Sequence, residues 1–563
     1  MSCAKLNTLS QSTKHLGHNV IERKEVKMLY LRNRCSVAIS CFSVLFVPFG
    51  CLFNNLNMNK PSTIRSVILA SSLGTLIEWY DFYIFGSLAL VISTKFFPQD
   101  NPTAAFLSTL ATFAAGFVVR PFGALFFGRL GDLIGRKYTF LVTLLLMGGS
   151  TFLIGCIPDY NTIGFFAPLL VLILRLLQGL ALGGEYGGAA TYVAEHSPAE
   201  KRGYWTSWIQ TTATAGLFVS LAVILITRNS LGTEAFEDWG WRIPFWISIL
   251  MVVVSFIIRK NMSESPVYSK LKSEGKTSTN PLKESFGNRY NFKFVLLALF
   301  GAVMGQGVIW YTGQFYAMNF IGKVCGVSNQ QTDTIMAIAL LLGTPAFVLF
   351  GSLSDKYGRK NIMMAGMLLA ILCYRPIYEK MYSTIDCSNK MELRRDLPKV
   401  KSSLLGKSGS DSIVATVNNI IYTDGTSNEI ITKDTLFTNG NRIPAKEIKK
   451  SISLNNNSYW ILVLLVLVQV IFVTMVYGPI AAFLVEMFPA KIRYSSMSLP
   501  YHIGNGIFGG LLPTVATYLV TNAKTAGHAQ WYLQGLWYPI IIGGICFVIG
   551  MIYLDKNDNK IND

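Results

Sequence analysis

Two acidic side chains in an apolar stretch near the start of the sequence could carry protons. Glu78 and Asp81, together with Gly74 and Phe85, fall on one face of a helix with 3.6 residues per turn. An acid held in lipid is costly, so it usually serves either as a proton carrier or as the partner of a buried arginine. Two acids on one face also repel each other when both are charged, which suits a group that binds and releases protons. The alternative is that water reaches this end of the helix.

Buried cations would be natural partners for these acids. Arg175, Gln178 and Glu185 occur in one long apolar stretch, within about 80° of one another around a helix axis, and Arg175 lies about 15 Å from Glu185 along it. An arginine in this position needs a counter-charge, and the two acids of the first stretch are the nearest candidates. Arg120 is either a second buried cation or a residue whose side chain reaches the membrane surface.

Polar and aromatic side chains further along the chain could line a pocket. Gln306, Trp310 and Gln314 fall on one helical face, with Tyr311 and Tyr316 beside them. Aromatic faces attract quaternary ammonium groups, so a betaine-like ligand would suit such a pocket. The alternative is ordinary aromatic packing.

A ten-residue motif that occurs twice indicates an internal duplication. Residues 128–137 read GRLGDLIGRK and residues 351–360 read GSLSDKYGRK, each between two long apolar stretches. Residues 195–202 and 486–493 form a second pair, with Glu, then Pro, then Arg at matching positions. We interpret both pairs as a latch, whose ion pairs break and form as two halves rock; the alternative is that the basic residues only mark topology. The latch residues are Gly128, Asp132, Gly135, Arg136, Lys137, Glu195, Arg202, Asp355, Arg359, Lys360, Glu486 and Arg493.

The composition predicts the elements that hold these residues. The mean hydropathy is +0.40, and 51% of the residues are hydrophobic while 14% are charged, which excludes an ordinary soluble protein. Apolar stretches of roughly 20 residues, long enough to cross a bilayer as helices, begin near residues 64, 104, 139, 165, 205, 241, 294, 332, 361, 459, 496 and 535. We therefore expect an all-α membrane protein with twelve transmembrane helices in two pseudo-symmetric six-helix halves.

The net charge of +18 does not indicate nucleic-acid binding, because the basic residues sort by side. They gather in the loops after the even-numbered stretches, among them Arg129, Lys201, Arg259 and Lys356. The positive-inside rule places these loops, and both ends of the bundle, in the cytoplasm. We expect a monomeric, multi-pass protein of the bacterial inner (plasma) membrane, in contact with lipid.

The two halves are separated and interrupted by polar segments. Residues 1–60 form an N-terminal extension that we expect to be untranslated or disordered, with translation starting at Met58. The other expected units are a first bundle at 61–260, a cytoplasmic central loop at 261–292, a second bundle at 293–554 with a polar periplasmic insert at 379–458, and a cytoplasmic tail at 555–563.

No pattern indicates an enzyme. The nine cysteines show neither a CxxC pair nor ligand spacing, so we expect no metal, no cofactor and no disulfide framework. Gly406, Lys407 and Ser408 resemble the end of a phosphate-binding loop, but Lys401 stands where that loop requires its first glycine. An ion gradient is therefore the expected energy source.

Several motifs together resemble the major facilitator superfamily, and within it the metabolite:proton symporter group that includes proline/betaine, α-ketoglutarate, citrate and shikimate transporters. Besides the repeated motifs, they are EWYDF at 78–82, RPFG at 120–123, RLLQGLALGGEYGGA at 175–189, WGWRIPF at 239–245, SESPVY at 263–268 and EMFPAKIRYS at 486–495. The resemblance spans about residues 62–554, apart from the insert. An insert of this length is unusual for the group. The resemblance implies alternating access and proton-coupled uptake. Some osmosensing members of the group carry a C-terminal coiled coil. The sequence after Leu554 has none, so we do not expect osmosensing.

These observations predict a proton-coupled symporter of a small organic solute of the proline or betaine type. A dicarboxylate or another carboxylate metabolite is the second candidate, and Arg120 and Arg175 would suit the carboxylate in either case. The alternative of another class is a transport-deficient nutrient receptor that uses the insert for signalling. The expected partners are the solute and protons.

Overall fold

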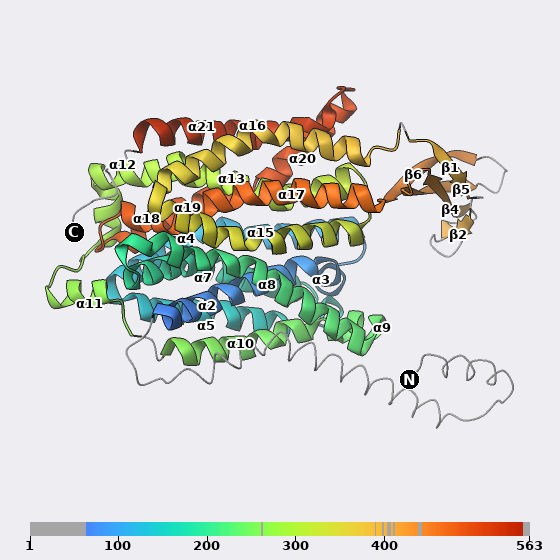
Figure 1. Cartoon of the computed structure of the whole chain (residues 1–563). Coiled ribbons are helices and arrows are strands. Elements are labelled where there is room, and N and C mark those ends of the chain that lie inside the picture. Colours follow the sequence, from blue (N-terminus) through green and yellow to red (C-terminus); the bar gives the residue numbers. More distant parts are fainter. Residues whose placement is uncertain are drawn as a thin grey trace, which may run out of the picture.

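The chain folds into a long helical bundle with a small β-sheet at one end (Figure 1). This computed structural model describes residues 64–260, 263–388, 390–396, 399–401, 407–408, 411–436 and 442–554. The expected N-terminal extension with its start at Met58, and the expected tail at 555–563, lie outside the described residues.

The first half of the bundle consists of six membrane-length segments. Asn101 caps the second one by accepting a hydrogen bond from the Ala104 amide (3.1 Å), and Pro102 occupies its first turn, where the missing N–H costs nothing. The long helices are α2 (Ile64–Ser87), α3 (Ala89–Phe96), α4 (Pro102–Ile134), α5 (Arg136–Ile154), α7 (Phe166–His196), α8 (Arg202–Leu231) and α10 (Arg242–Lys260). Short helical turns join them at α6 (Tyr160–Ile163), η2 (Ala199–Lys201), α9 (Thr233–Ala235) and η3 (Phe236–Gly240).

The second half begins with a helix that contains three π-helical turns, each of which adds a residue to the local turn. This helix comprises α12 (Arg289–Ala298), η5 (Leu299–Val303), α13 (Met304–Tyr311), η6 (Thr312–Tyr316), α14 (Ala317–Asn319) and η7 (Phe320–Val324). The rest of the half comprises α15 (Asn329–Tyr357), α16 (Arg359–Ile385), α17 (Asn456–Tyr477), α18 (Ile480–Met487), α19 (Arg493–Ile503), η9 (Gly504–Gly509), α20 (Leu512–Thr525), η10 (Trp531–Leu536) and α21 (Trp537–Tyr553).

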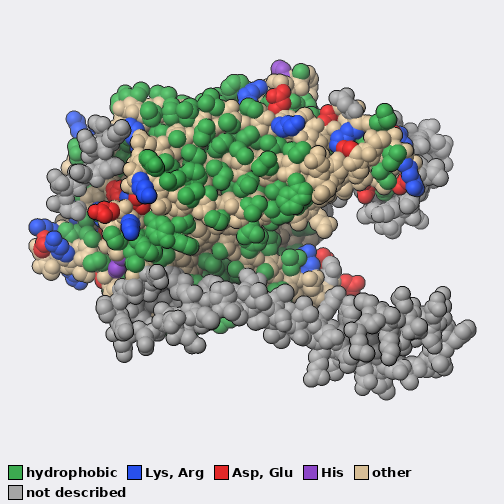
Figure 2. Space-filling model, in the orientation of Figure 1, with side chains coloured by type: hydrophobic (Ala, Val, Ile, Leu, Met, Phe, Trp, Pro, Cys, Tyr) green, Lys and Arg blue, Asp and Glu red, His purple; other side chains and the backbone are tan. Residues whose placement is uncertain are grey.

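The described residues account for the twelve expected spans. Ten helical segments are long and apolar enough to cross a membrane, and α2 with α3 forms an eleventh span with a bend of 64°. The twelfth is α10, whose apolar part, Arg242–Ile257, is shorter. Hydrophobic side chains cover the middle of the bundle surface, as Figure 2 shows, and charged ones gather toward its two ends. This surface suits lipid.

The two halves meet along two helix pairs, α4 with α19 and α8 with α15. Within the first half α4 packs closely on α7, because a side chain at Gly179 or Gly183 would collide with the backbone of α4. Gly135 (φ 116°) and Gly358 (φ 91°) adopt left-handed angles that permit the tight α4–α5 and α15–α16 turns of the repeated motif.

The polar insert is a sheet, which the sequence did not lead us to expect. Its strands are β1 (Glu392–Arg395), β2 (Lys399–Lys401), β3 (Lys407–Ser408), β4 (Asp411–Tyr422), β5 (Ser427–Leu436) and β6 (Arg442–Ser453). The order is β1-β4-β5-β6, with β2 and β3 also paired to β4, all antiparallel. The insert is also shorter than expected, because α16 continues to Ile385 and α17 begins at Asn456.

The sheet is fixed to the second half of the bundle. Ile452 exchanges backbone hydrogen bonds with Gly326 (2.7 Å) and Ser328 (2.9 Å), in the turn before α15. The Gln331 side chain exchanges two more with the backbone of Leu454. At the opposite end of the bundle, the expected central loop contains α11 (Pro266–Ser273) and the π-turn η4 (Lys283–Gly287). We call these two ends the sheet end and the α11 end.

Candidate functional site

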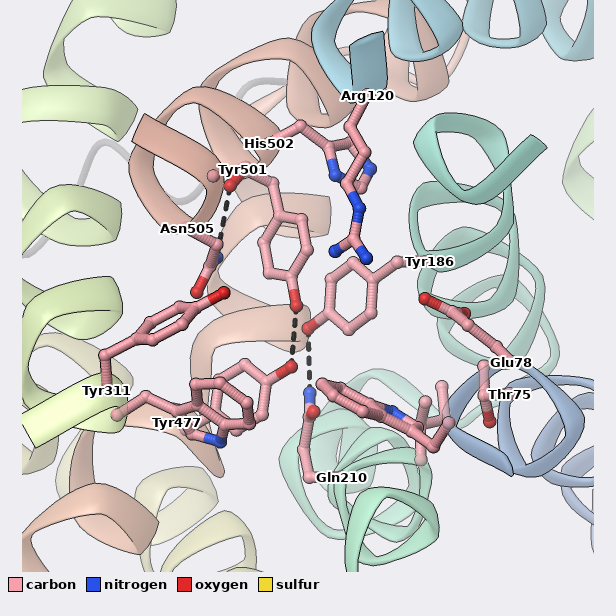
Figure 3. A pocket seen from close by; sticks show the side chains of 14 residues that line it. Thr75, Glu78, Arg120, Tyr186, Gln210, Tyr311, Tyr477, Tyr501, His502 and Asn505 are labelled. Carbon is pink, nitrogen blue, oxygen red and sulfur yellow. Dashed lines mark hydrogen bonds between the residues drawn. The ribbon is translucent and has the colours of Figure 1, made fainter. Parts of the chain in front are cut away.

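A small cavity lies between the two halves, midway along the bundle (Figure 3). Its free volume is about 30 Å³, which is room for a water-sized molecule and not for an organic solute. The residues that line it come from seven transmembrane segments; they are Thr75, Glu78, Trp79, Arg120, Tyr186, Ile209, Gln210, Trp310, Tyr311, Tyr477, Tyr501, His502, Asn505 and Gly506. Both halves thus contribute to one site.

Two opposite charges line this cavity and form no hydrogen bond or ion pair with a described residue. Arg120 of α4 stacks on the Phe117 ring, with its guanidinium carbon 4.2 Å from the ring centroid, and forms no hydrogen bond or ion pair with any described residue. It therefore points into the protein and not to the membrane surface. Glu78 of α2 is buried, and among the described residues no hydrogen bond or ion pair reaches its carboxylate. A ligand that carries both an anionic and a cationic group would complement this pair.

A stacked pair of tyrosines fills the centre of the site. Tyr186 of α7 and Tyr501 of α19 lie face to face, with ring centroids 3.7 Å apart and an interplanar angle of 5°. Gln210 donates a hydrogen bond to the Tyr186 hydroxyl (2.7 Å), and the Tyr477 and Tyr501 hydroxyls are 2.6 Å apart. Because the two rings belong to different halves, this stack joins the halves at the cavity.

Of the five pocket residues predicted on the seventh transmembrane helix, two line the cavity. Trp310 and Tyr311 line the cavity, and the Gln306 side chain exchanges two hydrogen bonds of 3.0 Å with Asn505, which also lines it. Gln314 and Tyr316 were wrongly placed in the pocket, because neither lines it.

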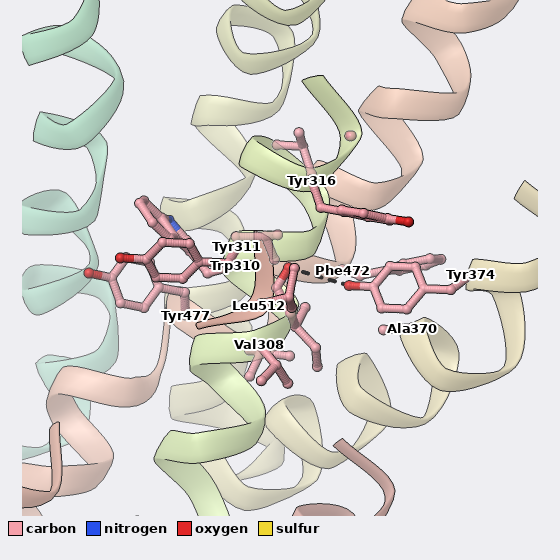
Figure 4. Close-up of a cluster of buried hydrophobic side chains, with 14 of the residues drawn as sticks. Val308, Trp310, Tyr311, Tyr316, Ala370, Tyr374, Phe472, Tyr477 and Leu512 are labelled. Atoms are coloured by element: carbon pink, nitrogen blue, oxygen red, sulfur yellow. Dashed lines mark hydrogen bonds between the residues drawn. The ribbon is translucent and has the colours of Figure 1, made fainter. Parts of the chain in front are cut away.

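Tyr316 belongs instead to the aromatic core of the second half. It packs on Tyr378, with ring centroids 5.5 Å apart, on the side of the helix away from Trp310 and Tyr311 (Figure 4). The regular helical period already places Tyr316 about 120° from Trp310 around the helix axis, so it was wrongly grouped with that face.

A buried chain of hydrogen bonds joins Arg175 to Asp81. Arg175 donates to Gln178 (2.7 Å), Gln178 donates to the Thr151 hydroxyl (2.5 Å), and Thr151 donates to Asp81 (2.8 Å). The expected direct ion pair of Arg175 is therefore replaced by an indirect connection. The guanidinium lies instead on the rings of Phe85 and another phenylalanine, with its carbon 3.7 Å from the Phe85 centroid. The second carboxylate oxygen of Asp81 is buried and has no partner.

Glu185 has a partner that the sequence did not reveal. Arg259, at the end of α10, forms a buried ion pair with Glu185, and Thr143 donates a further hydrogen bond to that carboxylate (2.8 Å). The pair lies against Gly74 of α2, where any side chain would collide with the guanidinium. The sequence predicts Arg259 to be a basic residue of a loop, because it precedes Lys260 at the end of an apolar stretch. Nothing in this position indicates burial.

The repeated motifs build two matching ion-pair clusters at the α11 end. In the first latch cluster, Asp132 of α4 and Glu195 of α7 lie 3.2 and 3.6 Å from the guanidinium of Arg136. The second half completes it: Arg493 of α19 pairs with Glu195 (3.0 Å), and the Ser495 amide (2.9 Å) and hydroxyl (2.7 Å) donate to Asp132. Asp132 therefore caps a helix of the other half.

The second latch cluster repeats this arrangement with the halves exchanged. Arg359 pairs with Asp355 (3.0 Å) and Glu486 (2.7 Å), both of the second half. From the first half, the amides of Gly203 and Tyr204 donate to Asp355 (both 2.8 Å), and Arg202 lies 3.9 Å from Glu486. Every predicted acidic and arginine latch residue is thus placed in one of the two clusters, and both clusters join the halves.

The remaining predicted latch residues are set around these clusters. Gly128 allows α4 to approach α19, because a Cβ there would lie 3.0 Å from the Ser495 Cα. Gly135 makes the α4–α5 turn. The amide of Lys137 donates to Glu264 (3.2 Å), and the Lys360 ammonium donates to the carbonyls of Met551 (3.0 Å) and Leu554.

Several lining residues could not be foreseen from the sequence. The tyrosines at 186, 477 and 501 and Trp79 are scattered among other aromatic residues of apolar stretches. The stretches around Tyr477 and Tyr501 carried a signal, since Gly478-Pro479 and Pro500 interrupt their regularity. No group of three His, Cys, Asp or Glu residues that could hold a metal ion occurs in the part of the chain that the structure describes.

Comparison with known proteins identifies relatives along most of the chain. A family model described as sugar (and other) transporter matches residues 67–290. The proline/betaine transporter of Escherichia coli K12 is 28% identical over 491 residues, which cover 86% of this chain and 83% of that protein. The inner membrane metabolite transport protein YhjE of the same organism is 30% identical over 81% of this chain and 88% of that protein.

The fold also has a counterpart among solved structures. The structure of the proton:xylose symporter XylE bound to 6-bromo-6-deoxy-D-glucose superposes with a TM-score of 0.60, and the match covers 87% of this chain and 96% of that chain. The sequence identity is 17%, so this likeness concerns the fold alone.

Proposed function

The chain belongs to the major facilitator superfamily, in its metabolite:proton symporter group, and on this premise we propose that it takes up a zwitterionic solute of the proline or betaine type together with protons. The observation that carries the proposal is the pair of unpartnered opposite charges, Arg120 and Glu78, in a cavity with aromatic walls. The name of the proline/betaine relative supports the same class of solute.

Each part of such a solute has a complementary group in the site. The Arg120 guanidinium presents a planar set of N–H donors that matches a carboxylate. Trp79 and Trp310, with ring centroids 5.5 Å apart, and Tyr311 offer aromatic faces to a quaternary or secondary ammonium group. Glu78 supplies the negative charge for the same ammonium group.

The buried acids are the proposed proton carriers. Asp81 has one buried carboxylate oxygen without a partner, and a proton on that oxygen removes an uncompensated charge from the protein interior. A series of hydrogen bonds runs from Asp81 through Thr151 and Gln178 to Arg175. Arg175 lies on α7, the helix that also contributes Tyr186 to the cavity. Glu78 lies in the cavity itself, so protonation there is coupled to binding of the solute's ammonium group.

The two latch clusters are the proposed gate. In this conformer they hold the α11 end shut, because each one joins the two halves. Opening exchanges these ion pairs for water and lets the halves rock about the stacked tyrosines. The many basic side chains at this end support a cytoplasmic location for it, with the sheet on the outer side of a bacterial inner membrane.

A dicarboxylate is the second candidate solute, because Arg120 and the neighbouring His502 would serve a second carboxylate as well as the first. Glu78 separates the two candidates, since its charge attracts an ammonium group and repels a carboxylate.

Calorimetric titration of the purified protein with proline, glycine betaine, succinate and a neutral sugar tests these assignments. We expect binding of the zwitterions. Loss of the charge-assisted hydrogen bonds in Arg120→Gln, about 1.5–3 kcal/mol, should weaken binding roughly 10- to 150-fold. Glu78→Gln should weaken zwitterion binding and strengthen that of succinate. Absence of zwitterion binding would overturn the proposal, and tight binding without uptake into vesicles would favour a receptor.

A further inference from the structure

A second hollow lies on the outside of the bundle, between α8 of the first half and α15 of the second. It encloses about 660 Å³, the size of a typical ligand pocket and far more than the central cavity. Its walls include Tyr204, Trp208 and Phe218 on α8 and Leu341 and Leu349 on α15. In Figure 1 the two helices run side by side on the face toward the viewer.

The groove is largely apolar, and three of its five hydroxyl groups are hydrogen-bonded within the protein. Thr211 donates to the Trp208 carbonyl of its own helix (2.7 Å), and Thr344 and Thr214 are hydrogen-bonded across the junction of the halves (3.0 Å). A polar solute would find no free partner among these hydroxyls. The environment instead matches a hydrocarbon chain.

The groove extends over the depth of one membrane leaflet. From Leu341 to Ser352 the wall formed by α15 rises about 16 Å, and half of a hydrocarbon core of roughly 30 Å is about 15 Å. The α8 wall, from Tyr204 to Phe218, rises about 21 Å and so extends slightly beyond this depth. One acyl chain that reaches from the membrane surface to the midplane would therefore fill it.

Basic side chains stand at the α11 end of both walls. Lys356 lies one helical turn beyond Ser352, and Lys201 lies one turn before Tyr204. Both lysines are exposed, and neither forms an ion pair with a described residue. Arg202 is also nearby but pairs with Glu486 (3.9 Å). Figure 2 shows basic side chains at this end of the same face.

We propose that this groove binds a phospholipid with an anionic head group, whose phosphate lies between Lys201 and Lys356 and one of whose acyl chains occupies the groove. The charge at the groove mouth selects the anionic head group, and the apolar depth selects the chain. The site contacts both halves, so the bound lipid favours the conformer in which the α11 end is closed.

Native mass spectrometry of the full chain in detergent, titrated with phosphatidylglycerol or phosphatidylcholine, tests the proposal independently of any transported solute. We expect one tightly bound phosphatidylglycerol and at least tenfold weaker phosphatidylcholine. The double variant Lys201→Gln/Lys356→Gln should lose roughly thirtyfold in phosphatidylglycerol affinity. Arg129→Gln/Lys260→Gln removes the same charge at the same end of the bundle and should change little.

A groove-filling variant provides the second arm. Ala215→Phe should reduce binding of both lipids, whereas Leu372→Phe, on an exposed part of α16, should not. Equal phosphatidylglycerol affinity in the two double variants, or equal affinity for the two lipids, would overturn the proposal. The proposal would also be overturned if the parent protein were a dimer and Ala215→Phe, but not Leu372→Phe, dissociated it. The groove would then bind a second copy of the chain.

Discussion

The most informative perturbation of the gate is Asp132→Asn. Asp132 belongs to the first half but accepts hydrogen bonds from the amide (2.9 Å) and hydroxyl (2.7 Å) of Ser495 in the second, and it lies 3.2 Å from the guanidinium of Arg136. It is almost fully buried, so solvent does not screen these interactions. An asparagine of the same shape keeps one acceptor oxygen and replaces the other with an N–H₂ group that faces donors.

The expected cost follows from these contacts. The variant loses one hydrogen bond to a charged acceptor, about 1.5–3 kcal/mol, and the attraction to Arg136, so that closing the α11 end becomes less favourable by about 2–4 kcal/mol. At about 1.4 kcal/mol per tenfold change, the ratio of closed to open molecules should fall roughly 30- to 700-fold. Asp355→Asn removes the equivalent contacts to Gly203 and Tyr204 and should act alike.

Pulsed electron paramagnetic resonance measures this ratio directly. Spin labels at Arg129, at the end of α4, and at Tyr357, at the end of α15, are exposed and lie on different halves. Their separation should be short and uniform in the parent protein and should gain a longer component in Asp132→Asn. Asp100→Asn, which changes an exposed acid at the other end, is the control. An unchanged distance distribution in both Asp132→Asn and Asp355→Asn would refute the gate.

Three further predictions concern stability. Glu185→Gln leaves Arg259 as an unpaired buried charge and should lower stability by about 3–5 kcal/mol, whereas Glu185→Gln/Arg259→Gln should recover most of it; a double variant as unstable as the single one in thermal unfolding would contradict this pairing. Gly74→Ala forces a methyl group against the same ion pair, so its melting temperature should fall by an amount corresponding to about 1–3 kcal/mol, and an unchanged melting temperature would argue against the packing. Partial burial raises the pKa of Asp424, but the Lys390 ammonium, 2.8 Å away, and two hydrogen bonds from Thr426 outweigh it and hold that pKa below its ordinary value. These contacts therefore stabilise the base of the sheet above about pH 4 and are lost as the pH falls further. Hydrogen-exchange protection factors there, which correct for the intrinsic exchange rate, should fall on acidification in the parent and fall less in Lys390→Met.

Much of the membrane architecture was predictable because lipid imposes long apolar helices. The twelve spans followed from the lengths of the apolar stretches, and the two halves followed from the repeated motifs. The duplicated motif also predicted two matching clusters. The sequence did not tell us that each cluster is completed by the other half, through residues such as Arg493.

The errors arose where local geometry or long-range contacts decide. Tyr316 packs on Tyr378 and away from the cavity, as its position about 120° from Trp310 at 3.6 residues per turn should have indicated. Arg259 read as a surface cation because its partner lies on another helix. The sheet was missed because its polar composition resembled a loop, although Asp424-Gly425 between two runs of alternating side chains is a hairpin signal.

The central claim is that buried acids couple proton entry to uptake of a zwitterion. Its most direct test is accumulation of labelled glycine betaine in proteoliposomes under an imposed pH gradient, with parent protein and Asp81→Asn compared at equal protein content. We predict concentrative uptake by the parent, while Asp81→Asn only equilibrates the solute yet still exchanges it across the membrane. Equal accumulation by both proteins, or no effect of the pH gradient on the parent, would contradict the account.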